Sequence, residues 1–583
     1  MRFRSASVGK VLGGFVGLFG VAAGCTSFGS DSTPPVVSSE AGTPDVSVLP
    51  GETINIESLA ITDKTVTVAQ GRETTLTVKI VRGPFRDEVA ISLKNLTKDF
   101  TSAPVVIPAG KDTVDIKLVA AATAPLGAGQ NVRVLAQSGV ASKDIEAPLL
   151  VVGAPGSLDL SYGDKGVYRG PEADVEQVYD AALLPDDSVI VAGRDTRGAF
   201  FRKITKDGKV DVAYGVGGKY QPIYTVVGSA PMYQPFAFAA LPDGRMLAAM
   251  DIFGPAAGGT AVLFVISADG RSHTQFLLPG GNFSQVHNVV PIGDDRYAIV
   301  GARTASTPDI ANGRGGGFVA AVFDGKTGKL DTSWGTATRY LVSGWPAAAP
   351  GQLQGTWITV DAETGVGYSM VKTDTNLWLI GDSAIQPNLE KGTTYGLAKL
   401  GFDGKFSADY GNQGINYWPF SAAFLGALPT GGNSFLLAGI REDAFVLRKF
   451  VDGMPETNFD LKVVSVPRVY KPMLGGRYEP NRTHGFAKER DGFLLAQAGY
   501  YPDGSPPGVY GLMARVRADG TLDRSFGREG VASMMFQHQQ SSEWVTTNVL
   551  VQKSGRVLMV GSSRDYAGVG GAEVSAYWPS LQR

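Results

Sequence analysis

The chain has 583 residues, a formal net charge of −2 at pH 7, and 43% hydrophobic against 19% charged residues. The near balance of charge excludes a basic protein that binds nucleic acid through its net charge, and the apolar content excludes a disordered chain. Gly accounts for 76 residues without a collagen period, which predicts many tight turns. The one Cys excludes a disulfide framework and a cysteine-based zinc site.

The first 24 residues have the features of an export signal. Arg2, Arg4 and Lys10 form a positive segment, and the uncharged apolar run VLGGFVGLFGVAAG of 14 residues follows it. A membrane span needs about 20 residues, whereas this length is typical of a signal peptide. We therefore exclude residues 1–24 from the fold, and we expect no later segment to span a membrane.

The apolar run ends in Ala22-Ala23-Gly24-Cys25, where Cys25 is the only cysteine. These residues resemble the lipobox of bacterial lipoproteins, although Ala22 replaces the usual Leu. The resemblance implies that Cys25 is acylated, for example with palmitate, and becomes the new N-terminus. It also implies sorting to the outer membrane, because Thr26 rather than Asp follows the cysteine. The alternative is an ordinary signal peptide whose cleavage leaves Cys25 unmodified.

Two segments separate this signal from the bulk of the chain. Residues 25–51 are rich in Ser, Thr, Pro and Gly without periodicity, which predicts a flexible tether. Residues 52–153 contain about seven short alternating runs, which predict an antiparallel β-sandwich. The pattern VAQGRETTLTVKIVR followed by VVIPAGKDTVDIKLVA resembles bacterial Ig-like domains of exported proteins. Such domains act as spacers more often than as binding modules.

Residues 156–583 are a repeat. A strand–turn–strand unit with a turn rich in Asp, Gly or Asn occurs seven times, as ALLPDDSVIVAG, ALPDGRMLAAM, VPIGDDRYAIVG, VKTDTNLWLIG, ALPTGGNSFLLAG, AKERDGFLLAQAG and VQKSGRVLMVG. A second unit of the type DGxLDxSFG follows each copy except the last. This pairing resembles the delta-60 repeat of bacterial β-propellers, whose function is poorly defined.

The last repeat lacks the second unit, but a copy of that unit, GSLDLSYGDKG, precedes the first complete repeat. We therefore expect residues 156–169 to complete the last blade of a seven-bladed propeller, which leaves no free sheet edge. Six blades, eight blades and an open array are the alternatives. The fold class is all-β: an Ig-like sandwich followed by a β-propeller.

The recurring signature residues have structural explanations. One aromatic residue per repeat should pack between blades, which applies to Tyr214, Trp334, Tyr410 and Phe526. The recurring acids should accept hydrogen bonds from backbone amides in the adjoining turn, which applies to Asp211, Asp331 and Asp523.

No catalytic or cofactor motif stands out. A Gly-x-Ser-x-Gly elbow, a Walker loop and HExxH are absent, and Asp207-Gly208 and Asp519-Gly520 lack the dense acids of a calcium loop. The tryptophan-docking motif of quinoproteins matches only weakly near Trp334. His287 is interpreted as an ordinary polar residue near the channel. We predict no enzyme activity, cofactor or metal.

The insertions carry the functional hypothesis. Extra length falls in the loops 304–317 and 345–365, and the loop 386–394 adds a polar rim. Aromatic and Pro-rich residues near Tyr500 and Pro506 could join them. The sequence predicts a lipid-anchored envelope protein whose propeller binds an envelope protein or a glycan, with no nucleic acid as partner. An extracytoplasmic hydrolase or lyase with its site in the channel, and a purely structural spacer, are the alternatives.

Overall fold

The structure is a computed structural model of the whole chain. It describes residues 55–62, 64–171, 176–222, 232–253, 260–278, 285–303, 317–331, 333–335, 358–361, 365–383, 394–411, 414–420, 422–441, 444–459, 462–466, 471–472, 485–501, 508–535, 548–564 and 570–579. Within these ranges the regular structure is β-strand apart from the 3-10 turn η3 (Thr457–Phe459), so the described chain is all-β. None of the described residues belongs to a helix with the length and hydropathy needed to cross a membrane. The predicted signal, Cys25 and the tether lie outside them.

Two sheets form the first folded part. One sheet has the order β1-β3-β7-β5, with strands β1 (Ile56–Ile61), β3 (Glu73–Arg82), β7 (Thr113–Ala120) and β5 (Phe100–Thr101). The other has the order β2-β9-β8-β4-β6, with strands β2 (Val66–Ala69), β9 (Ala141–Val152), β8 (Gly127–Ser138), β4 (Val89–Lys94) and β6 (Val105–Ile107). The predicted strand runs coincide with these strands, whereas β1 and β5 lie outside the predicted set.

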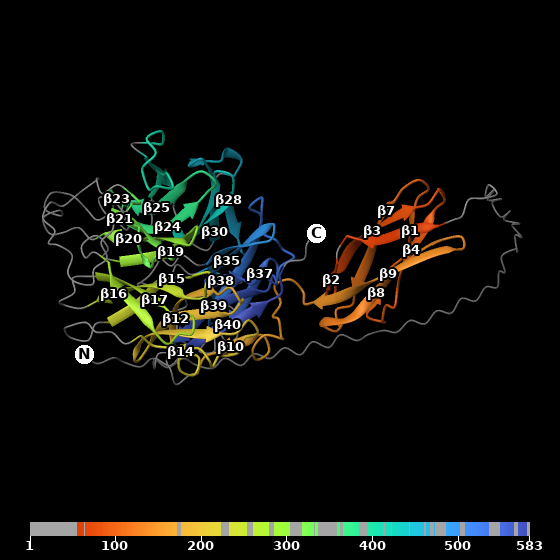
Figure 1. Cartoon of the computed structure of the whole chain (residues 1–583), viewed down its shortest axis with the longest axis horizontal. Helices are drawn as coiled ribbons and strands as arrows, with labels where there is room; N and C mark the ends of the chain where they lie inside the picture. Colours follow the sequence, from red (N-terminus) through yellow and green to blue (C-terminus); the bar gives the residue numbers. More distant parts are fainter. Residues whose placement is uncertain are drawn as a thin grey trace, which may run out of the picture. The chain divides into compact units, whose positions relative to one another are not determined.

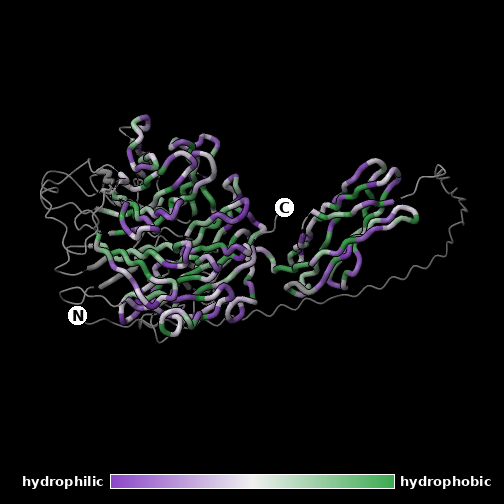
Figure 2. The backbone as a smooth tube through the Cα atoms, in the orientation of Figure 1, coloured by the Kyte–Doolittle hydropathy of each residue, from purple (hydrophilic) through white to green (hydrophobic). Residues whose placement is uncertain are grey.

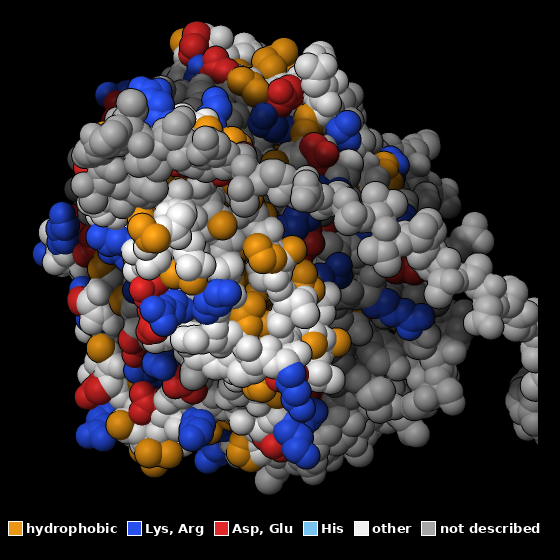
Figure 3. Space-filling model, turned by 90° about the vertical axis from the view of Figure 1, so that its right-hand side faces the viewer, with side chains coloured by type: hydrophobic (Ala, Val, Ile, Leu, Met, Phe, Trp, Pro, Cys, Tyr) orange, Lys and Arg blue, Asp and Glu red, His pale blue; other side chains and the backbone are white. Residues whose placement is uncertain are grey.

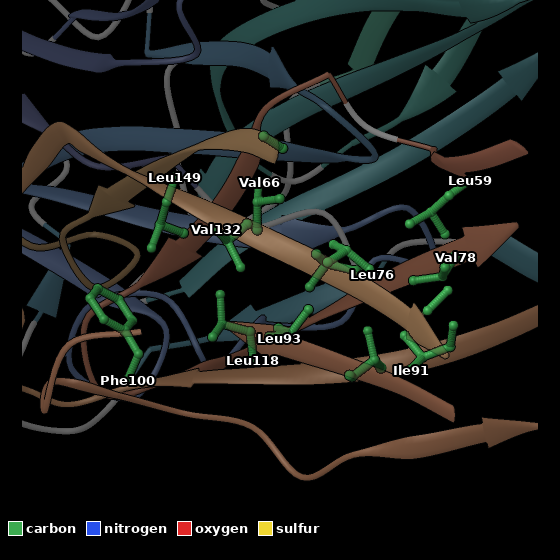
Figure 4. Close-up of a cluster of buried hydrophobic side chains, with 14 of the residues drawn as sticks. Leu59, Val66, Leu76, Val78, Ile91, Leu93, Phe100, Leu118, Val132 and Leu149 are labelled. Carbon is green, nitrogen blue, oxygen red and sulfur yellow. The ribbon is translucent and has the colours of Figure 1, made fainter. Parts of the chain in front are cut away.

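The two sheets share one apolar core, which Figure 4 shows in close-up. Alternate residues of each strand point into it; along β3, for example, Leu76, Val78 and Ile80 are buried between exposed neighbours. One expectation needs correction, because β2 pairs with β9 in parallel rather than antiparallel. Parallel strands need a long crossover connection, and the chain between β2 and β9, which forms β3 to β8, supplies it.

Seven further sheets make up the repeat region, here numbered in chain order (Figure 1). Sheets 1 to 4 contain β11 (Gln177–Leu183), β12 (Val189–Asp195), β13 (Gly198–Ile204), β14 (Lys219–Tyr220); β15 (Met232–Ala240), β16 (Met246–Phe253), β17 (Thr260–Ile266), β18 (His273–Leu277); β19 (Gln285–Gly293), β20 (Arg296–Arg303), β21 (Gly317–Asp324), β22 (Lys329–Leu330), β23 (Ile358–Asp361); and β24 (Gly365–Lys372), β25 (Leu377–Ser383), β26 (Thr394–Leu400), β27 (Ile415–Pro419).

Sheets 5 to 7 complete the set. They contain β28 (Ala423–Gly431), β29 (Ser434–Arg441), β30 (Ala444–Val451), β31 (Met454–Pro455), β32 (Lys462–Ser465); β33 (Lys471–Pro472), β34 (Phe486–Glu489), β35 (Gly492–Tyr501), β36 (Gly508–Arg517), β37 (Val531–Met535); and β38 (Asn548–Val551), β39 (Val557–Arg564), β40 (Gly570–Tyr577) with β10 (Val167–Arg169). The seven predicted strand–turn–strand units correspond to the pairs β11–β12, β15–β16, β19–β20, β24–β25, β28–β29, β34–β35 and β38–β39, whose members are called the first and second strands of their sheets below.

The sheets contact one another in chain order through their inner strands. Strand β11 contacts β15, and the succession continues through β19, β24, β28, β34 and β38, which contacts β11 again. Strand β10 pairs with β40, so a segment from the start of the region supplies the outer strand of its last sheet. Apolar residues of neighbouring sheets form shared cores, and hydrophobic stretches of chain run through the repeat region in the hydropathy colouring of Figure 2.

Candidate functional site

Each of the seven sheets has two different ends. At one, the turn end, a tight turn joins strand one to strand two, and in sheets 1 to 6 the segment that carries the second repeat unit follows strand three. In sheet 1 the turns are closed by Leu184 N to Ser188 O (2.8 Å) and Thr205 N to Lys209 O (2.7 Å). At the other, the loop end, the chain passes from strand two to three and from one sheet to the next. The sequence repeats lie at the turn end, and the connections that vary in length lie at the loop end.

Two of the three insertions selected from sequence join strands at the loop end. The loop 304–317 connects β20 to β21 in sheet 3, and the loop 386–394 connects β25 to β26 in sheet 4. The third, 345–365, includes β23 and leads into β24. Apart from these strand residues, the insertions lie outside the described part of the chain.

At the turn end, the recurring acids act as predicted. The Oδ1 atoms of Asp211, Asp331 and Asp523 accept hydrogen bonds from the backbone amides of the residues two positions on, at 3.1, 2.9 and 3.1 Å. Asp159, in the segment ahead of the repeats, does the same for Ser161 at 3.0 Å. These bonds confirm the turn-forming role.

Sequence analysis missed the second partner of these acids. In four sheets the acid also forms an ion pair with a basic residue of its own sheet: Asp159–Arg556 (2.6 Å), Asp211–Lys203 (3.1 Å), Asp331–Arg296 (2.6 Å) and Asp523–Arg515. Glu456, which follows Asp452-Gly453 in sheet 5 as Asp211 follows Asp207-Gly208 in sheet 1, pairs with Lys449 (2.8 Å). The bases lie in a second strand (Arg296), directly ahead of one (Arg556) or in a third strand (Lys203, Lys449 and Arg515), which is why no fixed sequence spacing reveals them. The pairs tie the outer turn of each of these sheets to its inner strands.

The ion pair of sheet 6 is the most buried, with Arg515 3% and Asp523 7% exposed at the side chain. Burial acts to raise the pKa of Asp523, but the Ser525 hydroxyl and amide and the Arg515 guanidinium outweigh it and hold that pKa below its ordinary value. Glu489 also contacts Arg515, at 2.7 Å. The charges of this group are therefore mutually compensated, which is the arrangement of a structural cluster rather than of a reactive one.

The aromatic signature residues pack between sheets, as predicted. Tyr214 belongs to a core shared by sheets 1 and 2, Trp334 to one shared by sheets 3 and 4, Tyr410 to one shared by sheets 4 and 5, and Phe526 to one shared by sheets 6 and 7. Tyr162, from the segment ahead of the repeats, occupies the same position between sheets 7 and 1. The signature therefore encodes the joints between sheets.

A glycine of the next sheet lies against each of these aromatic rings. At Gly270, whose φ is +64°, a Cβ atom would lie 2.3 Å from Cζ of Tyr214. Beside the ring, the amide of Gly215 donates to the carbonyl of Asp269 at 2.8 Å. The same amide-to-carbonyl bond recurs from Gly163 to Asp207 (2.9 Å), from Gly335 to Asp403 (2.8 Å) and from Gly527 to Pro155 (2.7 Å).

At the loop end, a β-bulge recurs in the inner strands. In five first strands the pairing register slips at one equivalent place: Val178/Asp180, Pro235/Ala237, Val286/Asn288, Gly367/Ser369 and Phe424/Gly426. The bulge explains the glycine that ends the second strand of most repeats, because at Gly193 a Cβ atom would lie 2.1 Å from the carbonyl oxygen of Gln177. His287 is the bulged residue of sheet 3 and is partly buried.

The residue that follows the bulge is polar in several sheets and reaches toward the neighbouring sheet. Asn548 of sheet 7 donates to Oδ1 of Asp180 in sheet 1 at 3.0 Å, and Oδ2 of Asp180 accepts the Phe238 amide of sheet 2 at 3.1 Å. Asn288 donates to the Ser369 hydroxyl at 3.3 Å. These buried side chains hydrogen-bond consecutive sheets to one another next to the loop end.

A second buried charge cluster lies at the loop end of sheet 1. The ammonium group of Lys219 contacts Glu176 Oε1 at 2.9 Å and Asp195 Oδ2 at 2.8 Å, and Arg202 donates to the same Glu176 oxygen. Gln221 donates to Asp195 at 2.8 Å. Two acids and two bases compensate one another, so this cluster fixes the chain where it enters sheet 1. Nothing in the local sequence pattern indicated it.

The described residues contain no group of three or more His, Cys, Asp or Glu side chains arranged to hold a metal ion. Cys25, His484 and His538 lie outside those residues. His273 contacts Tyr220 through Nδ1, and burial lowers the pKa of its imidazole. On the face that Figure 3 shows, basic and acidic side chains are interspersed rather than gathered by sign.

No family model and no curated protein matches the chain. Similar solved structures include domains 4 and 5 of the S-layer protein SbsC, at 19% identity over 17% of this chain and 54% of that one, with a TM-score of 0.14. An exo-1,5-alpha-L-arabinanase from a bovine ruminal metagenomic library is 13% identical over 60% of this chain and 98% of that one, with a TM-score of 0.26. A variant of Synechocystis apocarotenoid oxygenase is 9% identical over 70% and 85%, with a TM-score of 0.32.

The chain spans about half the length of that SbsC fragment. S-layer domains therefore stand among the structural neighbours of this all-β protein, and at these TM-scores the likeness carries no functional argument.

Proposed function

We propose that this protein is a lipid-anchored binding protein of the cell envelope, and that its seven sheets are the blades of a closed β-propeller of delta-60-like repeats. The succession of inner-strand contacts that returns from β38 to β11 supports the ring. The amide of Gly527 in sheet 6 donates to Pro155, and that of Gly163 donates to Asp207 in sheet 1. The segment 156–169 thus gives the last sheet its outer strand and its signature aromatic residue, which the other sheets take from their own repeats.

The observation that carries the binding function is the difference between the two ends. At the turn end, the recurring residues are engaged in turns, ion pairs and packing between sheets. At the loop end, a rigid and hydrogen-bonded frame carries connections that differ in length and composition from sheet to sheet. Recognition resides in such connections on rigid scaffolds. The proposal assigns no reaction to the protein.

The sandwich is proposed to be an Ig-like spacer between anchor and propeller. Strand β1 starts beside the end of β3, close to the turn that joins β8 to β9, as the bond from Lys143 to the Glu57 carbonyl (2.8 Å) shows. Strand β9 leaves at the opposite end, where Gln70 donates to Val152 at 2.9 Å. The 12 residues of β9 extend over about 40 Å at about 3.3 Å per residue, which sets the length of the spacer.

Capture of a partner tests the binding function. The full chain, purified from membranes in detergent, is used as bait for cross-linking in envelope extract and on a glycan panel. Replacing the loops 304–316 and 384–393 of sheets 3 and 4 with short Gly-Ser linkers should abolish a saturable interaction. The same replacement of 254–259, which joins the equivalent strands of sheet 2, is the matched control and should leave capture unchanged. The proposal would be contradicted if the chain with 304–316 and 384–393 replaced captured the partner as well as the parent does. It would also be contradicted if the folded parent chain captured no partner.

The anchor is tested separately. Cells given a palmitate analogue with a terminal alkyne should label the protein, and a Cys25→Ser variant should lose both the label and membrane association. A Thr26→Ser variant controls for changes near the cleavage site and should keep both. Labelling that persists in Cys25→Ser would refute the lipid anchor and leave the loop hypothesis untouched.

A further inference from the structure

The segment that connects the sandwich to the repeat region is buried. Gly153, Pro155 and Gly156 have little exposure to solvent, whereas domain boundaries ordinarily fall in exposed linkers. Val152, the last residue of β9, is 5% exposed. This connection therefore has the burial of a packed core rather than of a hinge.

Trp578, just after the last strand, covers the connection. A Cβ atom at Gly153 would lie 1.9 Å from Cδ1 of Trp578 and 2.1 Å from its Nε1, so the indole lies directly on the Gly153 backbone. Gly156 donates its amide to the Trp578 carbonyl at 2.9 Å, and Trp578 donates its amide to Ser157 at 2.9 Å. The backbone of the connection is thus paired with the end of sheet 7 in both directions.

A second sheet holds the same segment from its other side. The amide of Gly527 in sheet 6 donates to the Pro155 carbonyl at 2.7 Å, and a Cβ atom at Gly156 would lie 2.5 Å from the Gly527 nitrogen. Within the segment, the amide and hydroxyl of Ser157 both donate to the Ala154 carbonyl, at 2.9 and 2.6 Å. Pro155 adds a fixed φ angle.

We infer that residues 153–157 and Trp578 form a stiff joint, so that the sandwich and the repeat region move as one body. The connection behind the sandwich then adds no flexibility between the sandwich and the repeat region. A stiff joint restricts the directions in which the loop end can face, because its orientation follows that of the sandwich. The joint stands on contacts that are independent of the proposed binding function.

Double electron–electron resonance, which measures the distribution of distances between two spin labels, tests the joint. Ser142→Cys in the sandwich and Arg524→Cys in sheet 6 place both labels on exposed residues, in a full chain that carries Cys25→Ser. The distance distribution should be narrow and single. Trp578→Ala and Gly153→Val should each broaden it about twofold or more, because they remove the packing that restrains an otherwise ordinary linker.

Arg528→Ala is the matched control, since it removes an exposed side chain next to Gly527 and leaves residues 153–157, their backbone pairing and the indole in place. Its distribution should equal that of the parent. A broad or multiple distribution in the parent would overturn the inference, whatever the variants do. So would a distribution that stays narrow in both Trp578→Ala and Gly153→Val.

Discussion

Gly270 should contribute to stability through the neighbouring sheet as well as through its own turn. It has a φ of +64°, and an added Cβ would lie 2.3 Å from Cζ of Tyr214, a buried residue of sheet 1. Gly244 is a matched control in the same sheet: its φ is +84°, but the nearest atom to an added Cβ is Ala268 Cβ at 3.4 Å. The two positions share the backbone strain and differ in the contact between sheets.

The expected costs follow from these distances. Gly244→Ala places a Cβ in the left-handed region, which costs about 1–2 kcal/mol. Gly270→Ala adds the cost of overpacking, about 1–3 kcal/mol, because the Tyr214 ring cannot withdraw from a filled core. The free energy of unfolding should therefore fall by about 2–5 kcal/mol for Gly270→Ala, clearly more than for the control.

Urea denaturation followed by far-ultraviolet circular dichroism measures both variants against the parent. A double variant with Tyr214→Leu separates the contributions further: the smaller side chain should remove much of the penalty of Gly270→Ala and none of that of Gly244→Ala. Equal losses for the two single variants would refute the reasoning, because they would show that the turn conformation alone requires the glycine.

Three further predictions concern the ion pairs and the sandwich. The folded protein holds the pKa of Asp523 below its ordinary value of 3.8, so the ionised carboxylate stabilises the fold above pH 3.8 and this contribution is lost as the pH falls through the folded pKa. In Asp523→Asn, the free energy of unfolding should therefore fall less steeply with decreasing pH in the acid range. An unchanged pH dependence would contradict this. Asp159→Ala leaves Arg556 without its 2.6 Å carboxylate partner and should loosen the segment that completes sheet 7, which limited proteolysis detects as faster cleavage than in a Lys165→Ala control. Leu118→Ala, at a fully buried site between the two sheets of the sandwich, should lower the free energy of unfolding of the sandwich by about 2–5 kcal/mol. Calorimetry should show a lower unfolding temperature for the sandwich and an unchanged one for the repeat region. A shift of both transitions would argue against separate cores.

Much of the strand pattern could be predicted from the sequence, because period-two alternation and turn residues are local signals. The hydrogen bonds of Asp331 to its own turn and the packing of Trp334 followed from recurrence alone. The parallel pairing of β2 with β9 did not, since strand direction depends on which sheet a strand joins rather than on its own residues. The cluster around Glu176 was also inaccessible, because its partners are distant in sequence and brought together by the fold.

The glycine near the end of the second strand of most repeats shows a different limit. The sequence shows that it recurs but not why: Gly193 lies in a strand, where the carbonyl of Gln177, next to the bulge, leaves no room for a Cβ atom. A bulge has no fixed residue signature, so the reason for the glycine appears only when both strands are seen together.

The pairing of β10 with β40 has a consequence for how the protein is made. Val167 pairs with Ser575, so the first residues of the repeat region to emerge, on synthesis or on export, pair with some of the last. Sheet 7 therefore cannot form until nearly all of the repeat region has emerged, and residues 167–169 stay unpaired while the six other sheets form. Such distant pairing is slow and exposes unpaired strand edges on the way. We expect the growing chain to depend on binding by a chaperone until its two ends meet.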